Sequence, residues 1–119
     1  MENEFIPYKQ ALALKELGFD ESCLASYVKE TKEFTTRSFA DFYKDQQVLA
    51  PLYQQAFRWF REKYKLSGTP QYFTGGFYCY TINDMKDTEK SNRLFTEFET
   101  HEEAELACLI KLIEIIKIK

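Results

Sequence analysis

The chain has 119 residues, of which 45% are hydrophobic and 17% aromatic, so it can bury the core of one domain and is not a largely disordered protein. Its net charge of -3 argues against a protein that binds duplex nucleic acid by neutralising many phosphates. No apolar run approaches the roughly 20 residues of a transmembrane helix, and the N-terminus is acidic where a secretory signal is basic. We therefore expect one compact cytoplasmic domain over residues 1–119.

The first expected helix lies between Pro7 and Gly18. Proline suits the first turn of a helix, because the amide that it lacks would have no partner there. Glycine readily adopts the left-handed conformation that ends a helix, and such an ending places the next residue against the last turn. The sequence thus predicts that Phe19 packs on Leu14.

The segment after this helix favours strands. Residues 23–28 form a short apolar stretch, and residues 33–38 carry the β-favouring Phe34 and Thr35, so we expect a hairpin. Residues 39–47 mix aromatic and charged side chains, and their spacing fits either a short helical turn or a loop pinned to the core.

Pro51 opens a second expected helix that runs to about residue 66. Trp59 lies at the margin of its apolar face, and four polar residues fall within about 60° of one another on the opposite face: Gln54, Arg58, Arg61 and Lys65. This face is either a solvated surface or a docking surface for an acidic or phosphate-bearing partner. A boundary tryptophan beside two arginines is typical of interface hot spots.

Strands are expected at residues 71–74, 77–82 and 94–98, with a Gly75-Gly76 turn and a polar loop at 83–92. Because both faces of the middle strand are apolar, it belongs in the centre of a sheet or exposes an aromatic platform. In the second case Tyr78 and Tyr80 would stack on the bases of single-stranded RNA.

The last helix begins at residue 100, where Thr100 and Glu103 have the spacing of a capping box. Its apolar arc is wide and is interrupted by Glu105. We interpret the arc as packing on the sheet and against Phe57 and Phe60, although a partner could also cover it. The predicted fold is α+β, with three helices packed on a two-layer, mostly antiparallel sheet in the order α-β-β-α-β-β-β-α.

Neither a catalytic group nor a metal or cofactor site is predicted. The single histidine, His101, lies at a helix N-terminus and is expected to be exposed and neutral. The acidic residues of the 83–92 loop lack the spacing of a calcium site. Three widely separated cysteines indicate buried thiols rather than disulfides or zinc ligands: Cys23, Cys79 and Cys108.

Three blocks, at residues 8–23, 50–64 and 102–114, together resemble a family of short proteins from bacteriophages and prophages. They include Leu14 to Asp20, the Ala50-Pro51 start of the second helix, and Glu102 to Glu114. The resemblance implies no catalytic residue. It implies a phage-encoded inhibitor that binds a host bacterial defence component, such as an anti-CRISPR protein acting on an RNA-guided nuclease or its guide RNA.

The expected partner-binding residues are Arg58, Trp59, Arg61 and Lys65, with residues 39–47 and the Asp84–Asp87 loop as alternates. Two other functions remain open. One is a small single-stranded RNA-binding protein that uses Tyr78 and Tyr80, and the other is a homo-oligomeric phage accessory protein joined through the last helix.

Overall fold

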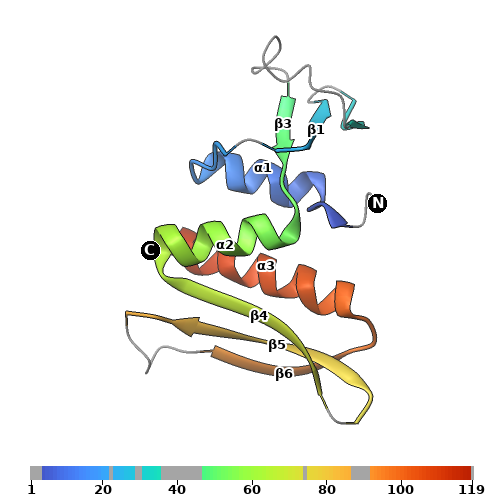
Figure 1. Ribbon diagram of the computed structural model, residues 1–119, viewed down its shortest axis with the longest axis vertical. Coiled ribbons are helices and arrows are strands. Elements are labelled where there is room, and N and C mark those ends of the chain that lie inside the picture. Colours follow the sequence, from blue (N-terminus) through green and yellow to red (C-terminus); the bar gives the residue numbers. More distant parts are fainter. Residues whose placement is uncertain are drawn as a thin grey trace. The chain divides into compact units, whose positions relative to one another are not determined.

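The computed structural model describes residues 4–21, 23–28, 31–35, 47–73, 75–86 and 92–118, and of residues 47, 73, 92–97 and 118 it describes the backbone alone. Over these residues the chain forms three helices and six strands, in the order α1, β1, β2, β3, α2, β4, β5, β6, α3 (Figure 1). They divide between two compact units, Met1–Tyr53 and Gln54–Lys119. The α+β class and the expected order are confirmed, with β3 as an additional strand and two sheets in place of one.

The first unit combines helix α1 (Tyr8–Glu16) with a three-stranded antiparallel sheet. Strand β1 (Ala25–Val28) lies in the centre, between β2 (Phe34–Thr35) and β3 (Gln47–Ala50). The pairs Tyr27–Phe34 and Tyr27–Val48 set the register, and α1 packs against β3. The predicted hairpin is therefore confirmed. Residues 39–46, whose structure was left open, lie outside the described residues.

The end of α1 has the predicted geometry. Gly18 has a φ of 99°, the Phe19 amide donates to the Leu14 carbonyl at 2.9 Å, and the Gly18 amide donates to the Lys15 carbonyl at 3.1 Å. These two bonds define a Schellman ending, and both Phe19 and Leu14 are buried. A local sequence signal was sufficient here because the ending involves only six consecutive residues.

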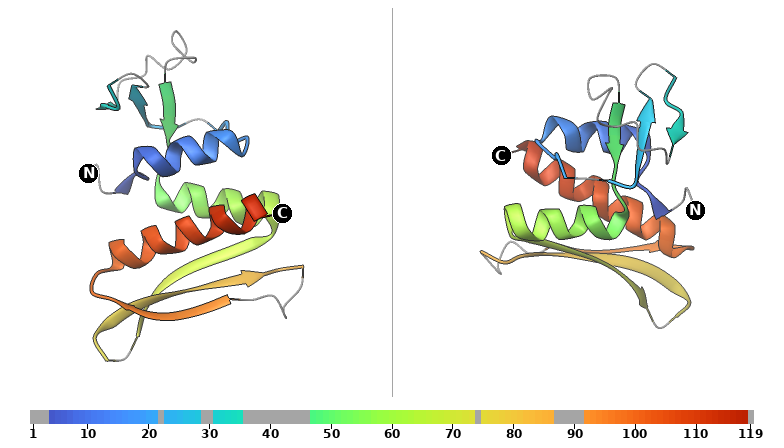
Figure 2. Two further views of the ribbon diagram at one scale, coloured as in Figure 1. Left: turned by 180° about the vertical axis from the view of Figure 1, so that it is seen from behind. Right: turned by 45° about the horizontal axis from the view of Figure 1, so that its top comes forward.

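The second unit consists of helix α2 (Tyr53–Tyr64), the antiparallel sheet β4-β5-β6 and helix α3 (His101–Ile118). Its strands are β4 (Leu66–Phe73), β5 (Phe77–Asp84) and β6 (Asn92–Phe98). Both helices lie on one side of this sheet, and α3 packs across β4 and β5 (Figures 1 and 2). Strand β5, with its two apolar faces, occupies the predicted central position.

Strand β4 begins earlier than the strand expected at residues 71–74, because residues 66–70 also belong to it. The Met85 amide donates to the Lys65 carbonyl at 2.8 Å, which makes this pair a hydrogen-bonded one. Hydrogen-bonded and non-hydrogen-bonded pairs alternate along an antiparallel ladder. Pro70 lies five residues after Lys65 and opposite Tyr80, so its pair is one that exchanges no hydrogen bonds. Pro70 therefore fits in β4, an edge strand, without breaking the ladder.

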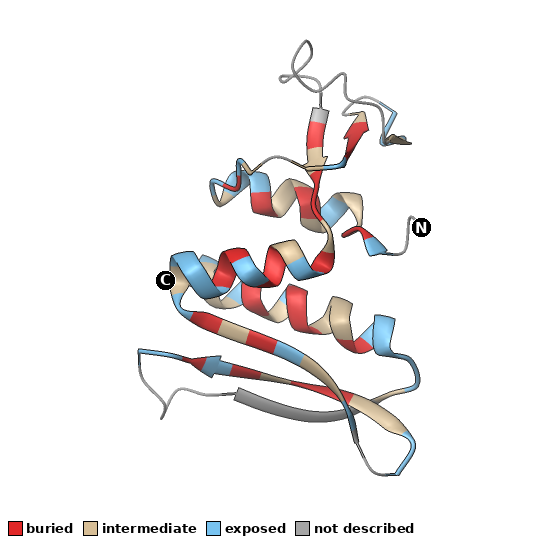
Figure 3. Cartoon of the chain, viewed as in Figure 1, coloured by how far each residue is buried: buried red, intermediate tan, exposed pale blue. Residues whose placement is uncertain are grey.

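Helix α3 starts at the predicted cap. The Glu103 amide donates to the Thr100 hydroxyl oxygen at 3.2 Å, but the Glu103 carboxylate accepts from the same hydroxyl rather than from the Thr100 amide. The buried side chains of the helix form one broad face (Figure 3): Ala104, Cys108, Leu109, Leu112 and Ile113. Among the described residues, no helix is both long and apolar enough to cross a membrane.

Candidate functional site

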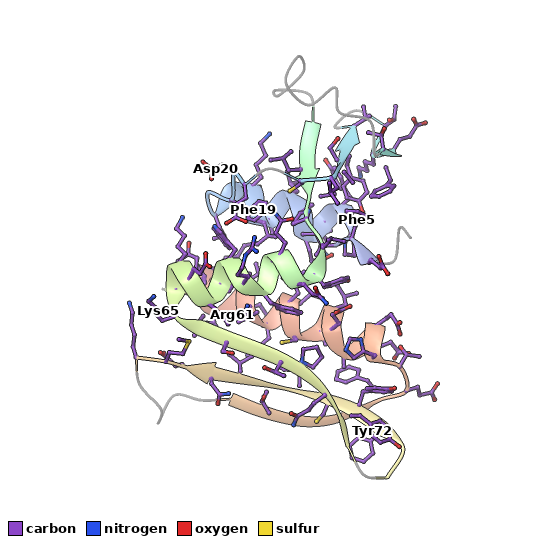
Figure 4. All side chains as sticks on the ribbon, in the orientation of Figure 1. Phe5, Phe19, Asp20, Arg61, Lys65 and Tyr72 are labelled. Atoms are coloured by element: carbon purple, nitrogen blue, oxygen red, sulfur yellow. The ribbon has the colours of Figure 1, made fainter. Side chains whose placement is uncertain are left out.

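The outward face of α2 carries the basic residues that the sequence singled out. Arg58, Arg61 and Lys65 follow one another at spacings of three and four, which places them on one side of a helix, and all three side chains are exposed. Arg61 lies on α2, and Lys65 lies just beyond its C-terminal end (Figure 4). Positive charge near that end also complements the helix dipole.

Lys65 ends α2 in the left-handed conformation, with a φ of 58°. Because its carbonyl accepts from the Met85 amide, the turn that follows β5 lies directly beside it. This turn adds the exposed Lys86 and the side chain of Met85, which is 57% exposed. We call Arg58, Arg61, Lys65 and Lys86 the basic surface. Lys86 belongs to the Asp84–Asp87 loop that the sequence named as an alternate contact, and the pairing of β4 with β5 brings it next to the residues of α2.

Asp84 shapes this turn rather than forming part of an exposed acidic loop. Its Oδ1 atom accepts from the Lys86 amide at 2.9 Å, and the residue is 8% exposed. The expectation of a polar, exposed loop starting at residue 83 was therefore wrong for Asp84, which ends β5. Residues 87–91, which include the other acidic residues of this loop, lie outside the described residues.

Trp59 does not lie at the boundary that the helical projection gave it, because it is only 6% exposed. Its ring packs edge-on to Phe60 at 5.1 Å and to Tyr64 at 5.4 Å between centroids. The Lys63 ammonium lies 5.1 Å from the centre of the indole ring. Neighbouring aromatic side chains and a lysine thus enclose a residue that was expected to be available to a partner.

The two tyrosines considered for RNA stacking lie on the face of β5 that α3 covers. Tyr80 is 4% exposed, and its ring stacks on Phe98 with 6.4 Å between centroids. Burial raises the pKa of Tyr80, as do Cys108 and Glu114. Because a buried ring offers no face to a base, Tyr80 cannot contribute to the Tyr78–Tyr80 platform that the sequence left open as an alternative. Tyr78 is half-buried and contacts Tyr72 and His101 instead.

The cysteines are free thiols, with Cys79 and Cys108 buried and Cys23 half-buried. Burial raises the pKa of Cys108 to about 12, with a further contribution from Glu105. The thiol therefore stays protonated near neutral pH and is a poor nucleophile there. Within the described ranges, no three histidine, cysteine or acidic side chains are grouped so that they could hold a metal ion.

Comparison of the chain with protein-family models, curated proteins and solved structures gave no match.

Proposed function

We propose that this chain is a non-enzymatic binding protein that docks on an acidic protein partner through the basic surface. One observation carries the proposal: the exposed Arg58 and Arg61 of α2 and the exposed Lys65 just beyond its end adjoin a turn that adds Lys86 and an exposed methionine. Cationic groups around an exposed apolar side chain provide both charge complementarity and apolar area to bury. Of the four residues expected to bind the partner, Trp59 supports α2 from within, and Arg58, Arg61 and Lys65 make the contact.

The wider role follows the family resemblance. On that basis we propose that the partner is a host bacterial defence component such as an RNA-guided nuclease, and that the protein inhibits it by occupying an acidic surface. Binding of the guide RNA by the same cations is the alternative. The two differ in their salt dependence, because contacts with many phosphates release counterions and make the affinity fall steeply as salt is added.

The test uses the full chain as bait for purified candidate nucleases, with and without their guide RNA. The binding variant reverses three charges of the basic surface: Arg58→Glu, Arg61→Glu and Lys65→Glu. The matched control reverses three exposed charges elsewhere: Lys9→Glu, Lys15→Glu and Lys117→Glu.

We expect the binding variant to lose capture at least about tenfold and the control to change it less than about twofold, with both variants folded by circular dichroism. Equal loss in both variants would show that net charge, not this surface, determines binding. If capture requires the guide RNA and falls steeply with salt, the bound partner is RNA and not the acidic protein surface.

A further inference from the structure

The first turns of α3 direct polar side chains toward the sheet where apolar ones are expected. His101, Glu105, Cys108 and Leu112 follow at spacings of four, three and four, so they form one stripe along the helix. The C-terminal part of this stripe contacts β4, because a β-carbon on Gly68 would meet both the Cys108 sulfur and the Leu112 side chain. His101 and Glu105 therefore share the sheet-facing side of α3.

Two tyrosines at the end of the β4–β5 hairpin face this stripe from the sheet. Tyr72 and Tyr78 are paired across the strands, and their rings pack edge-on with 5.3 Å between centroids. Tyr78 in turn packs edge-on to the His101 imidazole at 5.8 Å. We call Tyr72, Tyr78, His101 and Glu105 the aromatic–carboxylate row.

The packing of α3 on the sheet gives no reason for a carboxylate at position 105 of this row. The Glu105 carboxylate is half-buried and has no hydrogen bond or ion pair with any side chain that the structure describes, although His101 one turn earlier attracts it electrostatically. Burial, together with Glu102, raises the pKa of Glu105, whereas His101 lowers it. A carboxylate that breaks an apolar stripe and costs stability is typical of a position retained for binding.

The row is open to solvent and surrounded by negative charge. Tyr72 is 61% exposed, the largest value for a described tyrosine, phenylalanine or tryptophan, and lies at the hairpin end of β4 (Figure 4). Two further exposed carboxylates lie on the approach to α3 and on its first turn, Glu99 and Glu102, and Glu102 acts on the Glu105 carboxylate electrostatically. These groups would repel a phosphate and attract a cation.

We propose that the aromatic–carboxylate row binds an arginine side chain of a basic protein segment. A guanidinium group is planar, stacks on tyrosine rings and donates two parallel hydrogen bonds to one carboxylate, so one arginine can use both the tyrosines and Glu105. Lysine offers a point charge that matches only part of this arrangement.

This site is separate from the basic surface. The basic surface adjoins the pair Leu66–Asp84, whereas the row includes the pair Tyr72–Tyr78, six residues further along β4. At about 3.3 Å per residue, the two pairs are roughly 20 Å apart along the strand. The second unit thus presents a cation-rich end and an anion-rich aromatic end, and it can hold two partners of opposite charge.

The test is an NMR titration of the full chain with the capped peptide Gly-Arg-Gly-Arg-Gly and with its Gly-Lys-Gly-Lys-Gly twin. We expect shifts at Tyr72, Tyr78 and His101, with affinity for the arginine peptide at least about threefold higher than for the lysine peptide. Glu105→Gln weakens binding about tenfold, and Tyr72→Ala weakens it about threefold to tenfold without unfolding the chain. Glu114→Gln, the matched control on the exposed side of α3, changes it less than about twofold.

Equal affinities for the two peptides, or equal losses in Glu105→Gln and Glu114→Gln, would overturn the proposal in favour of unspecific charge attraction. The NMR signals of the row could also shift when the protein alone is diluted, and Tyr72→Ala could abolish this change. That result would identify a second copy of the chain as the occupant. Shifts of the same residues with oligouridine would assign the row to RNA. Failure of all peptide arms leaves the basic-surface proposal standing, because that proposal is tested with other variants.

Discussion

Gly68 of β4 lies directly against Cys108 of α3, so closely that a β-carbon on Gly68 would lie 2.8 Å from the Cys108 sulfur. The same atom would lie 2.9 Å from the Leu112 Cδ1 atom. The backbone of Gly68 does not require glycine for its φ, so the requirement is for space. Glycine here lets α3 approach the sheet near the middle of their contact.

We expect Gly68→Ala to lower the free energy of unfolding by about 1–3 kcal/mol, the usual cost of overpacking. Ser67→Ala, on the opposite face of the same strand, serves as the control. Urea denaturation measures both. In the double variant Gly68→Ala with Cys108→Ala, part of the loss should be recovered, since the sulfur is gone. Additive losses would contradict the contact.

Because the Cys108 thiol is buried, we expect the protein to lose stability at alkaline pH. The pKa of this thiol is raised from 9.0 to about 12 by burial and by Glu105, against a smaller opposing contribution from the Thr69 backbone. Because the folded state holds this proton more tightly than the unfolded state, the stabilisation is complete below pH 9 and is lost as the pH rises toward 12. Cys108→Ala should flatten this decline between pH 9 and 10.5 in urea denaturation. An unchanged slope would contradict it.

Glu105 is expected to change the stability of the protein in the acidic rather than the alkaline pH range. Its pKa is raised above 4.5 mainly by burial, so the folded state prefers the neutral carboxyl and stability falls as the pH rises above about 4.5. Glu105→Gln should therefore stabilise the protein at pH 7, by less than about 1 kcal/mol because the group is partly solvated, and have little effect at pH 3.5. Thermal denaturation at both pH values decides this, and equal effects at both would argue against a titrating carboxylate.

The buried Trp59 predicts a spectroscopic signature. We expect blue-shifted emission and weak quenching by acrylamide, because the indole is 6% exposed. Lys63→Ala, which removes the ammonium 5.1 Å from the indole centre, should cost about 0.5–1 kcal/mol of stability. Lys9→Ala, on α1, is the exposed control and should cost less than about 0.5 kcal/mol. Strong quenching in the native state would place Trp59 at the surface after all.

Capping of α3 gives a further measurement. The Thr100 hydroxyl accepts from the Glu103 amide, so Thr100→Ala should lower the free energy of unfolding by about 0.5–2 kcal/mol. Thr100→Ser keeps the acceptor and should change it by less than about 0.5 kcal/mol. Equal losses in the two variants would show that the methyl group, not the hydroxyl, matters at this position.

The sequence alone determined the features whose physical cause lies within a few residues. The Schellman ending at Gly18 and Phe19 and the cap at Thr100 follow from local backbone chemistry, and the exposure of Arg58 and Arg61 follows from helical spacing. The hairpin at β1 and β2, the central position of β5 and the α+β class follow from hydrophobic patterns.

Tertiary structure decided the features that depend on pairing between distant segments. Pro70 is tolerated because the register with Tyr80 requires no hydrogen bond from it, and Lys86 joins the basic surface because β5 returns beside Lys65. Trp59 is enclosed by its aromatic neighbours, and His101 meets the tyrosine pair through Tyr78 only because α3 packs on β4 and β5. Spacing along a chain fixes which face a side chain occupies, whereas only the packed strands and helices fix what that face meets.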